Sequence, residues 1–316
     1  MISRPIRARA GGGPGEERTA RRPAAPLGRR LLVLGAAAAV LCAALLGYGA
    51  FRATLYPVMG LERSAPRRTA LMLQREAEAR ANNHAYRIDQ RWVSYGRISP
   101  LLRRAMLIAE DDAFFQHGGL DWNEIRASAR ADLERRRVVR GGSTITQQLA
   151  KNLFLGDRRS VTRKVTEAFL AIRLERALDK RRIFELYLNL IEWGDGIFGV
   201  EAAAQRYFRV SASDLSERQA VLLAAVIINP RRYSVLAPSR RIERRVRLIA
   251  ERMRRRGYLG ELGFAVATGT PPPPSLADSM GLPSAETTSV ETAAGAAKVD
   301  TPAAVRVDST GLARSR

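Results

Sequence analysis

The feature that most constrains this chain is an uncharged apolar run of 21 residues, 31–51, near its N-terminus. A helix needs about 20 such residues to cross a bilayer. Arg29 and Arg30 precede the run directly, and the sequence before them carries further arginines but only two acidic residues. The positive-inside rule therefore predicts a single membrane-spanning helix over 29–51, with the N-terminus in the cytoplasm and the rest of the chain outside. A cleaved signal peptide is the alternative, but the run is long for one and no clear cleavage site follows it.

The chain is strongly basic, with a formal net charge of +22 at pH 7. Such a charge is typical of nucleic-acid binding, but a location outside the cytoplasm argues against that class. Anionic lipid headgroups or a phosphate-bearing substrate are the partners that this location favours. The single cysteine, Cys42, lies inside the apolar run, so the outer part has no disulfide, no cysteine zinc site and no thiol nucleophile.

Composition divides the chain on either side of the apolar run. Residues 1–28 are rich in Arg, Gly and Pro, which predicts a disordered basic cytoplasmic tail. Residues 52–264 carry helical patterns and are expected to form one mainly α-helical domain. Residues 265–316 contain four consecutive prolines followed by small polar residues, which predicts a low-complexity disordered tail. The best strand signal within the domain is 91–95, Arg-Trp-Val-Ser-Tyr.

Helix-start residues and helical spacing of apolar residues predict seven helices in the domain. Their approximate bounds are 99–113, 144–153, 161–178, 180–190, 199–207, 217–227 and 239–256. The last has Ile242, Val246, Ile249 and Met253 at helical spacing, which indicates a core-facing stripe. Its many arginines are interpreted as a solvated face, with binding of lipid headgroups as the alternative.

The run 141–152 combines a glycine turn, a helix start and a set of polar side chains. Thr144 followed by Gln147 fits a capping box, which satisfies the free backbone N–H groups of a helix's first turn. A helix start of this kind attracts anions. Lys151 follows Gln147 and Gln148 at helical spacing, so the three side chains are expected to share a surface suited to a phosphate or sugar hydroxyls. The alternative is a well-capped helix with a solvated polar stripe.

A second cationic group follows at Arg163, Lys164 and Glu167, whose spacing places them on one helical face. They are either intrahelical ion pairs, worth about 0.2–0.5 kcal/mol each, or a site for a pyrophosphate. A divalent metal bridging phosphate and Glu167 is compatible with the second interpretation. Ser160 and Arg159 would extend the same surface.

Glu110 is a candidate for proton transfer. It lies near a predicted helix end with Met106 one turn before it and Phe114 one turn after. Such apolar neighbours raise the pKa of a carboxyl toward the useful range, although an exposed helix-end glutamate is the alternative. His117 is a candidate metal ligand or base, but the only other histidine is His84, so a polyhistidine zinc site is excluded.

Four segments together resemble a known family. Residues 110–119 read Glu-Asp-x-x-Phe-x-x-His-x-Gly, which resembles the first signature of the family-51 peptidoglycan glycosyltransferases. Residues 141–152, 163–167 and 180–189 are similar to the second, third and fourth signatures, in the order and spacing of that family. The similarity extends over about 91–258.

The resemblance implies a lysozyme-like, mainly α-helical catalytic domain behind one N-terminal transmembrane helix. It implies polymerisation of lipid II into β-1,4-linked glycan with inversion and release of undecaprenyl pyrophosphate. Glu110 would be the general base, and Glu167, the second catalytic residue, would help to hold the departing pyrophosphate with or without Mg or Mn as the only cofactor. Residues implied to contact or position substrate are Asp111, Phe114, His117, Ser143, Thr144, Gln147, Gln148, Lys151, Asn152, Arg159, Arg163 and Lys164.

The resemblance also implies a place in the cell. The chain would be a single-pass protein of the bacterial cytoplasmic membrane with a periplasmic catalytic domain. Its partners would be lipid II, the growing glycan, membrane lipids and other cell-wall synthesis proteins, with no nucleic acid. Because no Ser-x-x-Lys element follows residue 264, the expected form lacks a transpeptidase domain. A lytic, lysozyme-like glycan hydrolase and a basic membrane-anchored scaffold are the rival classes.

Overall fold

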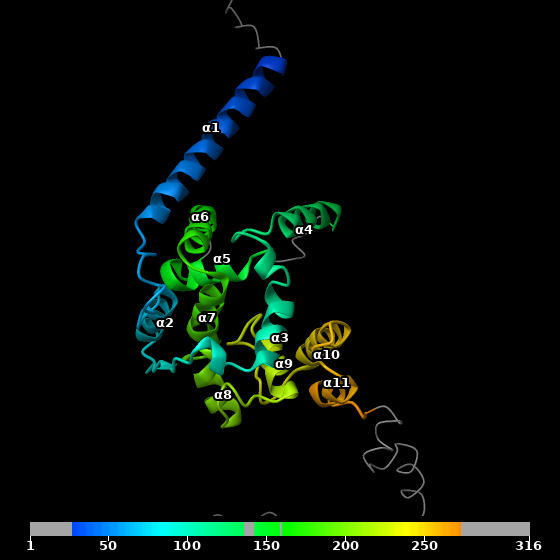
Figure 1. Cartoon of the computed structure of the whole chain (residues 1–316). Coiled ribbons are helices and arrows are strands. Elements are labelled where there is room, and N and C mark those ends of the chain that lie inside the picture. Colours follow the sequence, from blue (N-terminus) through cyan, green and yellow to red (C-terminus); the bar gives the residue numbers. More distant parts are fainter. Residues whose placement is uncertain (1–26, 136–141, 159, 273–316) are drawn as a thin grey trace, which may run out of the picture.

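The computed structural model describes residues 27–135, 142–158 and 160–272, and within them the protein is mainly helical, as predicted (Figure 1). The α-helices are α1 (Leu27–Thr54), α2 (Ala70–Ala81), α3 (Pro100–Glu110), α4 (Trp122–Arg135), α5 (Ile145–Ala150), α6 (Val161–Ala177), α7 (Lys180–Leu190), α8 (Val200–Phe208), α9 (Glu217–Val226), α10 (Arg240–Arg255) and α11 (Glu261–Thr268). Shorter turns are the 3-10 helices η1 (Tyr95–Arg97) and η2 (Phe114–Gln116) and the π-helix η3 (Lys151–Leu155).

Helix α1 projects away from the body of the molecule (Figure 1). It is the one described helix that is long and apolar enough to cross a membrane, over Leu31–Thr54. Its last turns pack on α6, where the backbone at Gly49 lies against Val165. Arg173 of α6 donates to the carbonyl oxygen of Ala53, near the C-terminal end of α1. The apolar helix is therefore attached to the domain by packing as well as by the chain.

The core is formed where α3, α5, α7 and α9 meet, with α10 and α11 covering α9. The second half of helix α7 is buried, and Tyr187 and Phe184 on this helix are among the largest fully buried side chains. The stripe predicted for α10, from Ile242 to Met253, is buried in this core. Its interpretation as a core-facing stripe is confirmed.

Three short strands form one small sheet in the order β1-β3-β2. Their bounds are β1 (Asp89–Gln90), β2 (Glu192–Gly194) and β3 (Ile197–Phe198). β1 pairs parallel with β3, and β2 pairs antiparallel with β3. The sheet lies beside α8, with which all three strands make contact.

The strand predicted over 91–95 is wrong. Side chains of α7 take the backbone groups that a neighbouring strand would have used. Asn189 accepts from the N–H of Val93 at 2.9 Å and donates to its carbonyl oxygen at 2.9 Å. Glu185 accepts from the N–H of Tyr95 at 2.8 Å, where η1 begins.

Other elements differ from expectation in extent. α2, α4 and α11 were not predicted, because their sequences are short or strongly polar for an amphipathic pattern. The helix expected over 144–153 is α5 continued by the π-turn η3, which ends at Gly156 with φ 70°. α11 continues through Thr268 and ends at Gly269 in the left-handed conformation, so the domain boundary expected at 264 falls inside a helix. The predicted tails lie outside the described residues except for 27–28 and 265–272.

Candidate active site

Glu110 is the last residue of α3, and its side chain is 15 % exposed. Met106 and Phe114 beside it are fully buried. Burial raises the pKa of the Glu110 carboxyl above its ordinary value, and a hydrogen bond from Gln148 and the positive charge of Arg245 partly oppose this effect. The environment expected from the sequence is therefore present, and an exposed helix-end glutamate is excluded.

Each carboxylate oxygen of Glu110 accepts one hydrogen bond from the protein. Gln148 Nε2 donates to Oε2 at 3.0 Å, and Arg245 Nη2 of α10 donates to Oε1 at 2.9 Å. Tyr187 donates its hydroxyl proton to Gln148 Oε1 at 3.2 Å. Since burial raises the pKa of Tyr187 well above its ordinary value, this phenol stays a donor. The tyrosine therefore turns the Gln148 amide so that its NH₂ faces Glu110.

Asp111 and His117 join the end of α3 to the start of α5. The backbone N–H of Gly119 donates to His117 Nδ1 at 3.2 Å, so the other ring nitrogen, Nε2, carries the proton that is shared with Asp111 at 3.0 Å. Asp111 also accepts from the N–H of Ile145, the first residue of α5, at 2.9 Å. These contacts fix the loop after Glu110.

The predicted capping box at the start of α5 is confirmed. Thr144 accepts from the N–H of Gln147, and Gln147 Oε1 accepts from the N–H of Thr144 at 3.0 Å. Both side chains are 3 % exposed. The shared surface expected of Gln147, Gln148 and Lys151 is thus incomplete, because Gln147 faces inward. Phe114 is also turned inward, with the Lys180 ammonium 4.3 Å from the centre of its ring.

Glu167 of α6 lies at the centre of a cationic cluster. Its side chain is 3 % exposed and accepts from Arg163 Nη1 at 2.6 Å and from Lys164 Nζ. Lys164 Nζ also donates to Ser143 Oγ at 2.7 Å, which ties α6 to the start of α5. Ser160 is the N-cap of α6. Arg159, the remaining predicted member, lies outside the described residues.

Lys151 connects the two carboxylates electrostatically. Burial lowers the pKa of Lys151, and the negative charge of Glu167 opposes this. The same ammonium acts on Glu110, where it lowers the pKa of the carboxyl. Lys151 lies on the π-turn η3 with Asn152, whose side chain is buried. Wider π-turns of this kind are frequent at functional sites.

Two hollows flank the Glu110–Gln148 pair. One, of about 700 Å³, lies between the end of α3, the start of α5 and α10, and is lined by Glu110, Ser143, Thr144 and Arg245 among others. The other, of about 400 Å³, is lined by Gln148, Lys151, Asn152 and Arg163. Predicted site residues thus line both hollows, one beside the carboxylate and one beside the cations.

The residues around Glu167 do not fit a divalent cation. Two cationic side chains already occupy the carboxylate oxygens, and Lys151 adds a third positive charge to the cluster. Within the described ranges no group of three or more His, Cys, Asp or Glu side chains is arranged to hold a metal ion.

Arg245 and Tyr187 are site residues that the sequence analysis missed. The arginines of α10 were interpreted as a solvated face, but Arg245 stands three residues after Ile242 and four before Ile249, both of which are buried. That spacing places Arg245 at the edge of the apolar stripe, so its half-buried position could have been predicted from the sequence. Its contact with Glu110 of α3 could not, because that contact depends on how two helices far apart in the sequence pack.

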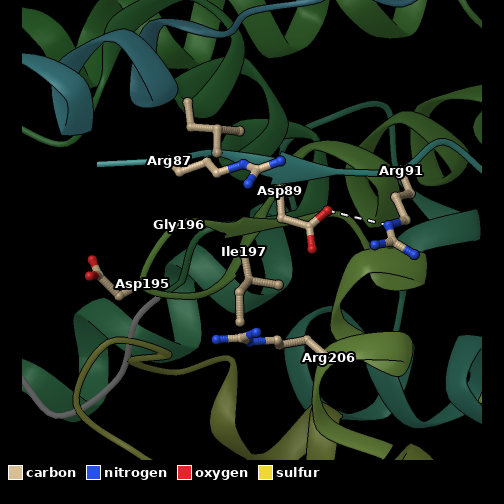
Figure 2. Close-up of a pocket in the computed structure, with 8 residues that line it drawn as sticks. Arg87, Asp89, Arg91, Asp195, Gly196, Ile197 and Arg206 are labelled. Carbon is tan, nitrogen blue, oxygen red and sulfur yellow. Dashed lines mark hydrogen bonds and ion pairs between the residues drawn. The ribbon is translucent and has the colours of Figure 1, made fainter. Parts of the chain in front are cut away.

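A separate hollow of about 370 Å³ is lined by Arg206 of α8 and by residues around β1 and β3 (Figure 2). Helix α8 lies at the end of the molecule away from α1 (Figure 1). Figure 2 shows the guanidinium groups of Arg87, Arg91 and Arg206 around Ile197, with Arg91 bonded to Asp89 at 3.3 Å. None of the predicted site residues lines this hollow.

Comparison with known proteins shows which family the chain belongs to. A family model described as Transglycosylase matches residues 77–254. The biosynthetic peptidoglycan transglycosylase of Laribacter hongkongensis is 50% identical over 188 residues, which are 60% of this chain and 82% of that protein. Proteins of the same description from Chromobacterium violaceum and Methylobacillus flagellatus are 45% and 47% identical, each over 60% of this chain and 82% of their own length. Since the model covers more than half of the chain and spans both Glu110 and Glu167, the chain belongs to the transglycosylase family.

Proposed function

We propose that the chain is a membrane-anchored peptidoglycan glycosyltransferase that polymerises lipid II into β-1,4-linked glycan and releases undecaprenyl pyrophosphate. The observation that carries this function is the position of Gln148, which donates to Glu110 and lines the same hollow as Lys151 and Arg163. A buried carboxylate and a cationic cluster therefore belong to one site. Polymerisation from a pyrophosphate-linked donor needs both.

Glu110 is the general base of the proposed reaction. It takes the proton from the 4-hydroxyl of the acceptor sugar, and the oxygen attacks the anomeric carbon of the donor. The bond from that carbon to the pyrophosphate breaks, and attack from the opposite face inverts the configuration. Both carboxylate oxygens of Glu110 are already oriented by Gln148 and Arg245, so little reorganisation precedes the proton transfer.

The cationic cluster receives the leaving group. Arg163, Lys164 and Lys151 stabilise the negative charge that develops on the pyrophosphate as the bond breaks. Arg163 Nε is buried and has no hydrogen-bond partner within the part of the chain that the structure describes. Buried donors are almost always paired, and a phosphate oxygen supplies the acceptor that this one lacks.

Five of the predicted residues support the site without direct contact with substrate: Thr144, Gln147, Asp111, His117 and Phe114. Their side chains are engaged in the capping box, in the link from α3 to α5, or in the core. Asn152 and Gln148 line the hollow beside the cations and are assigned to substrate contact.

The cationic cluster around Glu167 favours synthesis over cleavage. A lysozyme-like hydrolase protonates a leaving sugar and has no need of such a cluster. Here Arg163 and Lys164 both pair with Glu167 beside the hollow lined by Lys151. A pyrophosphate leaves as an anion and requires no such protonation.

The anchor and its orientation complete the proposal. Helix α1 holds the protein in the cytoplasmic membrane with the catalytic domain on the periplasmic side. Membrane lipids and other cell-wall synthesis proteins are its expected neighbours. The positive charge before the span supports this orientation.

The test is incubation of purified full-length protein with lipid II in detergent, with glycan polymer and free undecaprenyl pyrophosphate as the readouts. Wild type should form polymer, and Glu110→Gln should form less than a few per cent as much, because an amide cannot take the proton. Isolated sacculi serve as a parallel substrate. Digestion of sacculi without polymerisation of lipid II would instead indicate a hydrolase.

A further inference from the structure

Helix α10 holds the end of α3 through two arginines. Arg245 Nη2 donates to the carbonyl oxygen of Ala109 at 3.2 Å as well as to Glu110 Oε1 at 2.9 Å. Two turns further along α10, Arg252 donates to the carbonyl oxygen of Ile108 at 2.9 Å. The last carbonyls of a helix have no partner within it, and cations there are favourable. These arginines therefore cap α3 at the residues just before the carboxylate.

The contact of Arg245 with the carboxylate complements the contact of Gln148. Arg245 occupies Oε1, while Gln148, oriented by Tyr187, occupies Oε2. An ionised carboxylate has about four acceptor positions, so positions remain open on both oxygens. One of them can accept the acceptor sugar's hydroxyl without loss of either protein contact.

We propose that Arg245 is a positioning residue for the glycosyl transfer, which holds Glu110 Oε1, favours the ionised form of the carboxyl and aims it into the hollow between α3, α5 and α10. This inference rests on the proposed role of Glu110 as general base. Arg245 acts through Glu110 and through the Ala109 carbonyl. It is distinct from the arginines and lysines of the leaving-group cluster, which belong to α6 and η3.

Among the charged and titratable groups of the described residues that face Glu110, Arg245 is the one in direct contact with the carboxylate. From η3, Lys151 acts at longer range without a hydrogen bond, and from α3 the neighbouring Asp111 opposes ionisation. From α7, Tyr187 remains neutral and reaches Glu110 only through Gln148. Arg245 is thus the one charged side chain in the described structure that donates directly to this carboxylate. Without it, a buried base keeps one neutral donor and a distant ammonium.

A purely structural role would behave differently. If Arg245 only capped α3, its loss would lower stability and lower activity equally at every pH. If Arg245 favours the ionised form of Glu110, its loss raises the pKa of Glu110. The carboxyl then stays protonated up to a higher pH, so activity returns only in more alkaline solution. The position of the acid limb of the rate profile therefore separates the two roles.

The experiment measures kcat/KM on lipid II in detergent from acid to alkaline pH, for wild type and three full-length variants. For Arg245→Gln the acid limb should move to higher pH by about 1–3 pH units, the range typical of losing a close opposite charge. Arg245→Lys, which keeps the charge, should lie between wild type and Arg245→Gln. The matched control is Arg244→Gln, which removes an exposed charge from the same helix and should leave the profile in place. Loss for Arg245→Gln that is uniform in pH would overturn the proposal.

A second readout does not need activity. Titration of isotope-labelled glutamate carboxyls by NMR, with Glu110 assigned from the Glu110→Gln variant, should show a higher midpoint for Glu110 in Arg245→Gln than in wild type. Equal midpoints would overturn the proposal even if rates fall. A wild type that forms no polymer would count against the proposed function alone, because the titration of Glu110 is measured without substrate.

Discussion

At the scale of single residues, the proposed base Glu110 would link catalysis to the stability of the fold. The folded protein raises its pKa, chiefly through burial. Below the unfolded pKa the carboxyl is protonated in both states. As pH rises through the folded pKa, the folded state must carry a buried charge and stability is lost.

We therefore expect Glu110→Gln, which does not titrate, to gain stability relative to wild type as pH rises from acid to neutral. The gain is about 1.4 kcal/mol in free energy of unfolding for each pH unit by which folding raises the pKa. Thermal melts of both proteins in the same detergent at several pH values measure it. A difference in melting temperature that does not change with pH would show that Glu110 is not held in a raised-pKa environment.

The cationic cluster gives a second prediction. Arg163→Ala and Lys164→Ala should each lower the initial rate on lipid II by about 10²-fold, the usual effect of losing one donor to developing charge. Arg247→Ala removes the same charge from an exposed position on α10 and serves as the control. If all three variants lose activity equally, only total charge matters and the α6 residues are surface ion pairs.

Whether a contact of these residues could be predicted from the sequence depends on how far apart its two partners lie along the chain. The capping box of Thr144 and Gln147 was predictable because both partners lie in one turn. The grouping of Arg163, Lys164 and Glu167 was predictable because it follows helical spacing. The contacts of Glu110 with Gln148 and Arg245 span 38 and 135 residues of sequence, so no local pattern contains them.

At the scale of elements, the contact between α1 and α6 depends on a glycine. A Cβ at Gly49 would lie 2.5 Å from Val165 Cγ1 and 3.3 Å from the backbone nitrogen of Thr166. Gly49→Val should therefore push α1 off α6 and cost about 1–3 kcal/mol by overpacking. Gly47→Val is the matched control, since a Cβ there meets nothing within 4 Å.

The measurement is melting temperature in detergent together with polymerisation in lipid vesicles. Both should fall for Gly49→Val and hold for Gly47→Val. Equal behaviour of the two variants would mean that the α1–α6 contact carries no stability.

Arg75 ties α2 to two other elements. Its side chain is 10% exposed and pairs with Glu192 of β2 at 3.1 Å and with Asp157, just after η3, at 2.7 Å. Arg75→Met leaves these carboxylates without their shared cation and should cost about 3–5 kcal/mol. Arg68→Met breaks the half-exposed pair with Glu76 and should cost under about 1 kcal/mol. Denaturant unfolding of both variants checks the ranking, and a loss for Arg75→Met no larger than for Arg68→Met would contradict it.

Helices with strong periodicity were predictable, whereas the elements held by neighbours were not. α6, α7 and α10 begin and end within one or two residues of expectation. The segment 91–95 has the composition of a strand, but Asn189 and Glu185 of α7 bind its backbone. Propensity describes the segment alone, and tertiary contact decided its structure.

At the scale of the whole molecule, the boundary of the domain lies beyond the expected residue 264. α11 packs on α9 and α10, with Ala265 and Ala267 buried, and Arg218 of α9 donates to the carbonyl oxygen of Ala267 at 3.0 Å. A chain that ends at residue 272 should keep wild-type melting temperature and activity, because the later sequence lacks the apolar residues of a core. A chain that ends at residue 260 should melt lower, since it exposes the faces of α9 and α10 that α11 covers. Equal melting of the two truncations would show that α11 is dispensable.

In the proposed membrane-anchored enzyme, the docking of α1 on α6 also determines how the protein meets a lipid-linked substrate. A flexible linker would let the catalytic domain tilt and rise above the bilayer, so that each encounter required the domain to find the right height. Here α6, which carries Arg163, Lys164 and Glu167, packs on the last turns of α1. This contact fixes the depth of the two cationic side chains relative to the bilayer. Enzyme and substrate then search for each other by lateral diffusion in one plane, and the diphosphate arrives at the level where it is needed.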